Sequence, residues 1–269
     1  MSITYSSCFY ILKSKFDSST YIQWMNNLIS IANNFYLVIY SDENSSTFID
    51  TKNNPNIKII IKPIEQFYNY KYKDYWIKNH AKNNLINDKS GWELNMLWSE
   101  KIWFVKECVE RQYFDTEMYG WCDIGYFRNR AYDTHSHNIP NWSNVEKISN
   151  LNKEKISYAC INNDDKYMKY LHKIINNKNT LGLPIQEIPA YQTSISGGFF
   201  ILHKDKIDWW SKIYDDKLRL YFTHNYLVKD DQIILVDCIL SNINSHNFTL
   251  FRENNRIFDN WFMFQRILN

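Results

Sequence analysis

The 269-residue sequence is poor in glycine, proline and cysteine, with six, five and five residues respectively. So little glycine and proline excludes a collagen-like or low-complexity chain, and 45% hydrophobic residues exclude a disordered one. The chain is also long enough to bury a sizeable core. The cysteines are odd in number and lack the close spacing of a zinc or redox motif, so we expect buried, reduced thiols.

Long apolar runs and a strong net charge are also missing. No stretch approaches the roughly 20 apolar residues of a membrane span, and residues 1–5 lack the start of a secretion signal. With 31 Lys and Arg against 29 Asp and Glu, the formal net charge of +2 does not favour nucleic acid or an anionic membrane as the main partner. We therefore expect a cytoplasmic protein with no membrane span and no nucleic-acid partner.

Apolar runs alternate with helical periodicity along the first half of the chain. Four short apolar runs predict buried strands, at residues 7–12, 35–40, 57–61 and 118–122. Apolar residues at three- and four-residue steps predict helices over 18–32 and 92–112. Continuous apolar strands separated by helices indicate a parallel sheet with both faces covered. Residues 65–89 have weak periodicity, and we expect mobile or irregular structure there.

The second half repeats this pattern less regularly. It predicts strands at 156–161 and 196–202, and helices at 164–175, around 209–213 and over 230–240. The aromatic tail, residues 248–250 and 257–268, is expected to pack back on the body. No internal repeat or linker divides the chain, so we predict a single α/β domain.

Two acidic loops follow predicted strands, at the end of the sheet where open α/β folds bind ligands. Asp42 follows residues 35–40, and Asp123 follows residues 118–122. Gly125 comes two residues after Asp123 and lets a ligand approach the backbone closely. Carboxylate oxygens at this place suit a hard cation such as Mn²⁺ or Mg²⁺. The alternative is a turn in which Asp123 only accepts hydrogen bonds from local backbone groups.

Two further segments carry residues suited to a site. Gly197 and Gly198 lead a predicted strand, which indicates either close approach of the backbone to a ligand or a β-bulge. Asp230 and Asp231 open an apolar helix, where both carboxylates complement the helix dipole. Alternatively, one of the two acts as a general base while the other caps the helix.

Together these motifs resemble the WlaTC/HtrL (YibB-like) family. The resemblance spans nearly the whole chain and is carried by Trp98-Ser99-Glu100-Lys101, Trp121-Cys122-Asp123-Ile124-Gly125-Tyr126-Phe127-Arg128, Ser196-Gly197-Gly198-Phe199-Phe200 and Asp231-Gln232. Members of that family are regarded as glycosyltransferases of the GT-A type. Their Rossmann-like, mainly parallel sheet binds a nucleotide-sugar across a metal held by an Asp-x-Asp motif at a strand end.

The resemblance implies one GT-A-like domain over residues 1–269, with a nucleotide-binding half (1–130) and an acceptor-side half (131–269). It implies transfer of a sugar, such as a hexose, from a nucleotide-sugar donor, such as a UDP-sugar. The acceptor hydroxyl would belong to a glycan, a protein or a lipid-linked sugar. The implied roles are catalysis by Asp231 and Asp230, metal binding (Mn²⁺ or Mg²⁺) by Asp123, and donor binding by Asp42, Lys101, Asp123, Gly125, Arg128, Gly197 and Gly198.

The sequence departs from the family pattern at Gly125, which stands in the place of the second acid of Asp-x-Asp. Two other interpretations therefore stay open: a non-catalytic carbohydrate-binding protein on a degenerate GT-A fold, and a different nucleotide-dependent transferase on the same sheet. Within the first interpretation, inversion needs a carboxylate such as Asp231 to deprotonate the acceptor. In a retaining reaction the leaving phosphate takes that proton.

Overall fold

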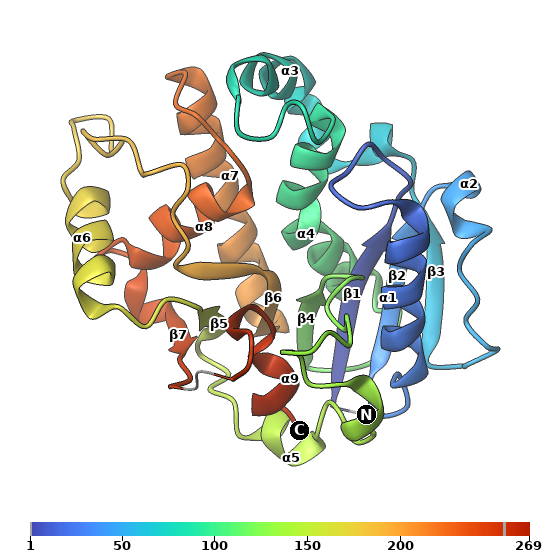
Figure 1. Ribbon diagram of the computed structural model, residues 1–269. Helices are drawn as coiled ribbons and strands as arrows, with labels where there is room; N and C mark the ends of the chain where they lie inside the picture. Colours follow the sequence, from blue (N-terminus) through green and yellow to red (C-terminus); the bar gives the residue numbers. More distant parts are fainter. Residues whose placement is uncertain (1, 255–256) are drawn as a thin grey trace.

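The computed structural model describes residues 2–254 and 257–269 and is built on one seven-stranded mixed sheet with helices on both faces (Figure 1). The strand order across the sheet is β3-β2-β1-β4-β6-β5-β7. The strands are β1 (Ile3–Phe9), β2 (Tyr36–Ser41), β3 (Ile57–Ile61), β4 (Met118–Cys122), β5 (Ile156–Cys160), β6 (Ile195–His203) and β7 (Phe248–Phe251). The chain is thus an α/β protein with a mostly parallel sheet, compatible with a Rossmann-like fold.

Helices of very different length cover the sheet. The α-helices of the described part are α1 (Ser18–Ser30), α2 (Glu43–Ser46), α3 (Lys73–Lys82), α4 (Trp92–Arg111), α5 (Val145–Ser149), α6 (Asp165–Asn176), α7 (Ile207–Thr223), α8 (Asp231–Leu240) and α9 (Phe264–Ile267). Short 3-10 helices are η1 (Ile64–Gln66), η2 (Tyr68–Tyr72), η3 (Ser136–Asn138), η4 (Lys204–Lys206), η5 (Ser245–Asn247) and η6 (Asn260–Phe262). Among the described helices, none has the length and hydropathy needed to span a bilayer.

The direction of β6 corrects the expectation of a parallel sheet. β1 pairs in parallel with β2 and β4, β2 with β3, and β5 with β7, but β6 is antiparallel to both β4 and β5. A strand buried on both faces has a continuous apolar sequence whichever way it runs, so its direction could not be predicted. As a result, the first residues of β6 lie at the same edge as the last residues of β4.

Alternating strand residues build two cores, one on each face of the sheet. In β2, Val38 and Tyr40 pack on the face covered by α4, α7 and α8, whereas Leu37 and Ile39 pack toward α1 and α9. Phe264 of α9 is fully buried in the second core, so the tail packs back on the body as predicted.

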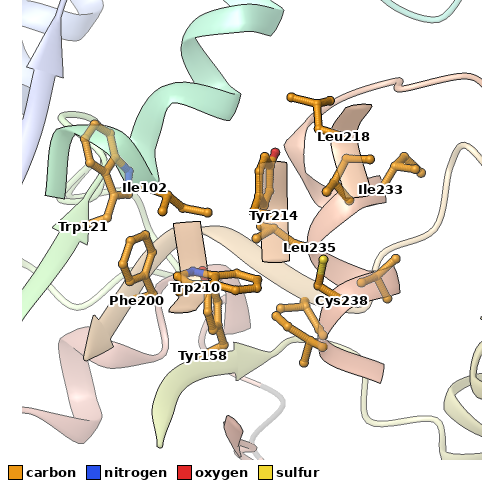
Figure 2. Close-up of a cluster of buried hydrophobic side chains, with 14 of the residues drawn as sticks. Ile102, Trp121, Tyr158, Phe200, Trp210, Tyr214, Leu218, Ile233, Leu235 and Cys238 are labelled. Carbon is orange, nitrogen blue, oxygen red and sulfur yellow. The ribbon is translucent and has the colours of Figure 1, made fainter. Parts of the chain in front are cut away.

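The first core is rich in aromatic side chains, part of which Figure 2 shows. Trp210 of α7 donates through Nε1 to the hydroxyl of Tyr158 at 3.1 Å, and Tyr158 stacks on Phe200 of β6. The five cysteines are buried and unpaired, in agreement with the expectation of free thiols. Both observations show that the bulky and thiol side chains serve packing.

Two predicted segments differ from the structure for reasons of tertiary contact. β1 begins at Ile3 and not at residue 7, because Thr4 and Ser6 are buried with hydrogen bonds to Thr116 and to the backbone of Phe104. The segment 65–89 is wrongly predicted as irregular, because it contains η1, η2 and α3. These elements are stabilised by distant partners, such as the contact of Trp76 with Phe222 of α7, and leave no local periodicity.

Candidate active site

A cavity of about 590 Å³ opens at the edge of the sheet where β1 and β4 end. The chain runs from β1 outward to β3 and then crosses back to β4 on the other side of β1, so the strand order reverses between these two strands. In open α/β sheets ligands bind in the crevice at such a switch point. The start of β6 and the N-terminus of α8 complete the cavity wall.

The structure brings nearly all of the predicted site residues to this one cavity. Those that line it are Lys101, Asp123, Gly125, Arg128, Gly197, Gly198, Asp230 and Asp231. They come from the interior of α4, the end of β4 with the loop after it, the start of β6 and the start of α8. Lys101 and Asp231 are 130 residues apart in the sequence. Both the first and second halves of the chain therefore contribute to the cavity.

Asp42 does not join them. It is the N-cap of α2, where its carboxylate accepts hydrogen bonds from the backbone N–H of Ser45 at 2.7 Å and from the Ser45 hydroxyl at 3.0 Å. Ser45 Oγ in turn accepts from the N–H of Ile11, at 2.9 Å. The prediction of Asp42 as a donor-binding residue is wrong, because an Asp that follows a strand can equally cap the next helix. Through Ser45, Asp42 thus connects the start of α2 to the backbone of the segment that follows β1.

Asp123 lies directly after β4 and presents its carboxylate to the cavity. Its N–H donates to the carbonyl of Gly198 at 2.9 Å, which fixes the end of β4 against β6. Its Oδ1 accepts from Trp121 Nε1 at 2.5 Å and pairs with Lys101 Nζ at 3.0 Å, and the side chain is 39% exposed. No described residue donates to Oδ2. The carboxylate is therefore held by side chains, not by the local turn that was the alternative.

Lys101 joins the two acidic parts of the site. Its buried ammonium lies 3.0 Å from Asp123 Oδ1 and 3.2 Å from Asp231 Oδ2, and it donates to the carbonyl of Gly197 at 2.9 Å. Burial lowers the pKa of Lys101, but the two carboxylates outweigh burial and raise that pKa above its ordinary value. Of these three contacts, the one to the Gly197 carbonyl is a hydrogen bond, and those to the two carboxylates are ion pairs. Lys101 thus holds the carboxylates, and their negative charges already compensate its positive charge.

Asp231 is the first residue of α8 and is almost completely buried. Burial raises the pKa of its carboxyl to about 6; Lys101 opposes this shift, and the negative charges of Asp230 and Asp123 add to it. The carboxylate is therefore ionised at neutral pH but remains basic enough to accept a proton. This combination is typical of a general base.

Asp230 departs from its predicted role. It occupies the N-cap position of α8 but makes no side-chain cap hydrogen bond, and its Oδ2 pairs with Lys229 Nζ at 2.7 Å. Its backbone is extended, with φ −156°, so the spacing of helix faces does not separate it from Asp231, and both residues line the cavity. The alternative in which one acid caps the helix while the other acts as the base is wrong for the cap, because the Asp230 side chain makes no cap hydrogen bond.

Each glycine of the site leaves room for a particular neighbour. A Cβ on Gly197 would lie 2.6 Å from Asp231 Oδ2, and one on Gly198 would lie 3.1 Å from Asp123 Oδ2. The pairing of β6 with β5 also shifts in register across this segment, between Tyr158 and Cys160, which is compatible with the bulge interpretation on that side. Because Gly197 and Gly198 have no side chain, the carboxylates of Asp231 and Asp123 can lie close to the first residues of β6.

We expect Gly197→Ala to lower the rate of a reaction that uses Asp231 as its base about 10²-fold, because the added methyl displaces the Asp231 carboxylate by a large fraction of an ångström. Gly198→Ala is the matched comparison and should have a smaller effect, since its contact of 3.1 Å needs only a slight shift. Steady-state rates and melting temperatures of both variants provide the test. Equal losses of rate in the two variants would contradict this view of Gly197.

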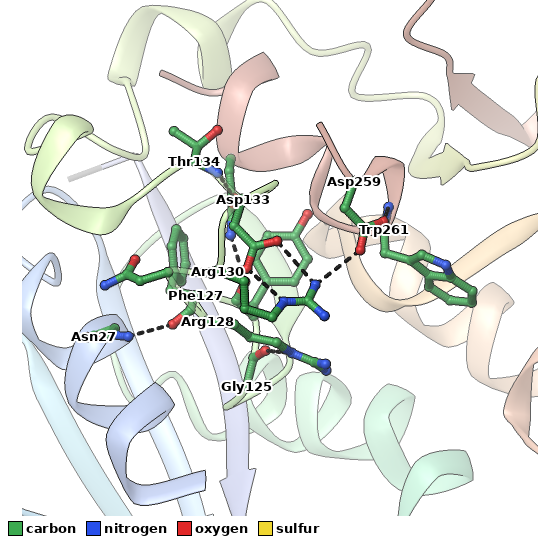
Figure 3. A network of polar contacts seen from close by, with 12 residues as sticks. Asn27, Gly125, Phe127, Arg128, Arg130, Asp133, Thr134, Asp259 and Trp261 are labelled. Carbon is green, nitrogen blue, oxygen red and sulfur yellow. Dashed lines mark hydrogen bonds and ion pairs between the residues drawn. The ribbon is translucent and has the colours of Figure 1, made fainter. Parts of the chain in front are cut away.

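Several residues that shape the cavity could not be predicted from the sequence. Arg130 lines it next to Arg128 and forms a forked ion pair with Asp133, and it also reaches Asp259 at 3.1 Å (Figure 3). Asp259 belongs to the C-terminal segment, which places Trp261 at the cavity wall. The contact of Arg130 with Asp259 leaves no local signal in the sequence, because the two residues lie 129 positions apart.

The donor set for a divalent cation is small. Among the described residues, no group of three or more His, Cys, Asp and Glu side chains is arranged to hold a metal ion. Asp123 Oδ1 is engaged by Lys101 and Trp121, which leaves Oδ2 as the one free ligand atom of the motif. The residues therefore do not fit a metal held by an Asp-x-Asp motif, and the expectation of Mn²⁺ or Mg²⁺ at Asp123 stays a prediction.

No family model matches the sequence. No curated protein matches it either.

Proposed function

We propose that the protein is a GT-A-like glycosyltransferase that moves a sugar from a nucleotide-sugar, such as a UDP-sugar, to an acceptor hydroxyl. The observation that carries the proposal is the row of paired charges Asp123–Lys101–Asp231, of which Lys101 and Asp231 are buried, in a switch-point cavity. Its volume of about 590 Å³ lies within the usual range for a small-molecule site. In this proposal residues 1–130 hold the nucleotide, and residues 131–269 provide the acceptor side.

The walls of the cavity suit a ligand that is part aromatic and part polar. Tyr10, Phe16, Trp98 and Trp261 line it, and such side chains stack on sugar rings and nucleobases. The carboxylates of Asp123 and Asp231 accept hydrogen bonds from sugar hydroxyls. The five buried, unpaired cysteines support a reducing location for this reaction, and we place it in the cytoplasm.

The chemistry follows from the positions of the two carboxylates. In the transfer, the bond between the anomeric carbon and the diphosphate oxygen breaks, and its electron pair stays on the diphosphate. The acceptor oxygen forms the new bond to that carbon, and Asp231 takes the proton of the acceptor hydroxyl. Lys101 orients Asp231 and keeps it ionised. This assignment favours inversion, because the base is a protein carboxylate.

The test is a panel of nucleotide-sugars offered to the purified protein with and without Mn²⁺, with binding followed by thermal shift and turnover by release of the nucleoside diphosphate. We expect at least one UDP-sugar to raise the melting temperature and to be consumed. Free sugars that bind without any nucleotide binding would identify a carbohydrate-binding protein instead. Turnover of a nucleotide without a sugar would identify another transferase.

A further inference from the structure

A departing diphosphate needs positive charge, and the cavity offers few cations with free donors. Lys101 is paired with Asp123 and Asp231 and donates to the Gly197 carbonyl. Arg130 is paired with Asp133 and Asp259. Two exposed lysines, Lys15 and Lys89, stand at the rim. Arg128 differs from all of these, because it is half-buried inside the cavity and most of its donors have no protein partner.

Arg128 is held in one orientation by its surroundings. Its Nε donates to the carbonyl of Gly125 at 2.9 Å, the one hydrogen bond that it makes within the described part of the chain (Figure 3). The guanidinium carbon lies 4.3 Å from the ring centroid of Trp24, 5.1 Å from that of Phe262 and 5.7 Å from that of Phe16. The aromatic rings fix the plane of the guanidinium and leave its two terminal nitrogens for a ligand.

Trp24 also explains the missing acid. A Cβ added to Gly125 would lie 2.8 Å from Trp24 Cε3 and 3.4 Å from Cζ3, so the indole fills the direction in which a side chain at position 125 would start. The place of the second acid of Asp-x-Asp is therefore occupied by the ring on which Arg128 lies. The packing of Trp24 against Gly125 therefore excludes an acidic metal ligand at position 125, and the same indole holds the guanidinium of Arg128.

The charge of Arg128 is only partly compensated. Burial lowers its pKa, the neighbouring Arg130 lowers it further, and Asp123 and Tyr21 act in the opposite direction. A guanidinium stays protonated throughout the physiological range even so. An incompletely neutralised, preorganised cation in a cavity is suited to a phosphate, which it can bind through two parallel hydrogen bonds.

We propose that Arg128, stacked on Trp24, binds the diphosphate of the nucleotide donor in place of a divalent cation, so that the donor binds without metal. This inference rests on the proposed function. As the bond from sugar to diphosphate breaks, the electron pair stays on the diphosphate oxygen, and the terminal nitrogens of Arg128 stabilise its charge. Asp123 then contacts the sugar and not a metal.

The experiment measures UDP binding by calorimetry in EDTA and in Mn²⁺, for the wild type, Arg128→Gln, Arg128→Lys and Arg219→Gln. Inorganic pyrophosphate is a second probe that lacks the nucleoside. Arg219 pairs with Asp216 on the surface of α7, so Arg219→Gln removes the same charge away from the cavity. Arg128→Lys keeps the charge but loses the planar fork, and it is informative if Arg128→Gln does not fold.

We expect the wild type and Arg219→Gln to bind UDP equally well in EDTA and in Mn²⁺. Arg128→Gln should bind about 10- to 100-fold more weakly, and Arg128→Lys should fall between them. UDP binding that requires Mn²⁺, or that is unchanged in both Arg128 variants, would overturn this inference and leave the proposed function standing. If no nucleotide-sugar of the panel binds in either condition, the proposed function itself is overturned.

Discussion

Asp231→Asn is expected to lower sugar transfer about 10²- to 10⁴-fold, the usual loss when a general base is removed. The amide has nearly the same shape as the carboxyl but cannot take the proton of the acceptor hydroxyl. UDP-sugar affinity should hardly change, because the loss falls on the acceptor side. Transfer rate and donor affinity, measured on the same preparation, test this expectation.

The pH dependence and the neighbouring acid provide controls. Because the pKa of Asp231 is raised to about 6, the active carboxylate form prevails above that pH, and kcat/KM should fall about tenfold per pH unit below it. The residual activity of Asp231→Asn should not show this fall at low pH. Asp230→Asn removes an adjacent charge that pairs with Lys229, and it should lose much less activity. A dead Asp230→Asn beside a normal Asp231→Asn would reverse the two roles.

Lys101→Met is expected to destabilise the protein by about 3 kcal/mol near pH 8, the lower end of the range for breaking a buried ion pair. The substitution leaves the carboxylates of Asp123 and Asp231 without their shared cation. We take the lower end because the Asp123 side chain is 39% exposed and water screens part of its charge. Activity should be lost as well, since both carboxylates lose their position.

The sign of the pH effect distinguishes this explanation from simple loss of packing. Without Lys101, the negative charges of Asp123 and Asp231 lack their shared cation. Protonation of Asp231 removes one of these two charges, so the destabilisation by Lys101→Met should become smaller as the pH falls from 8 to 5. Urea unfolding at both pH values measures it. Lys106→Met on the same helix removes a partly exposed lysine that pairs with Glu110 and Asp208, and it should cost at most about 1 kcal/mol. A destabilisation by Lys101→Met that is the same at pH 8 and at pH 5 would contradict the electrostatic explanation.

The sequence predicted the parts of the site whose signals are local. β3 and β4 fall at their expected bounds, and Asp123 and Asp231 were found because they stand at a strand end and a helix start. Trp24 could not be found in this way. Its importance depends on packing against Gly125, a hundred residues later, and nothing near it in the sequence indicates that contact.

The same limit applies to errors of assignment. Asp42 has the same local context as Asp123, a carboxylate directly after a buried strand, yet only Asp123 lies at the switch point of the sheet. The strand order that separates these two cases is a property of the whole fold. Residue type and position thus predicted that a carboxylate stands at each of these two strand ends. The topology of the sheet determines that only Asp123 lies at the cavity.

The antiparallel strand β6 has a consequence for how the chain acquires its site. β6 lies between β4 and β5, so before it is inserted the sheet consists of two separate pieces, and β4 has an open edge. The carbonyl of Gly197, which holds Lys101, arrives only with that strand. In the nascent chain β1 to β4 precede β6, so the Gly197 contact of Lys101 and the covering of the open edge of β4 both depend on the same long-range pairing of β4 with β6.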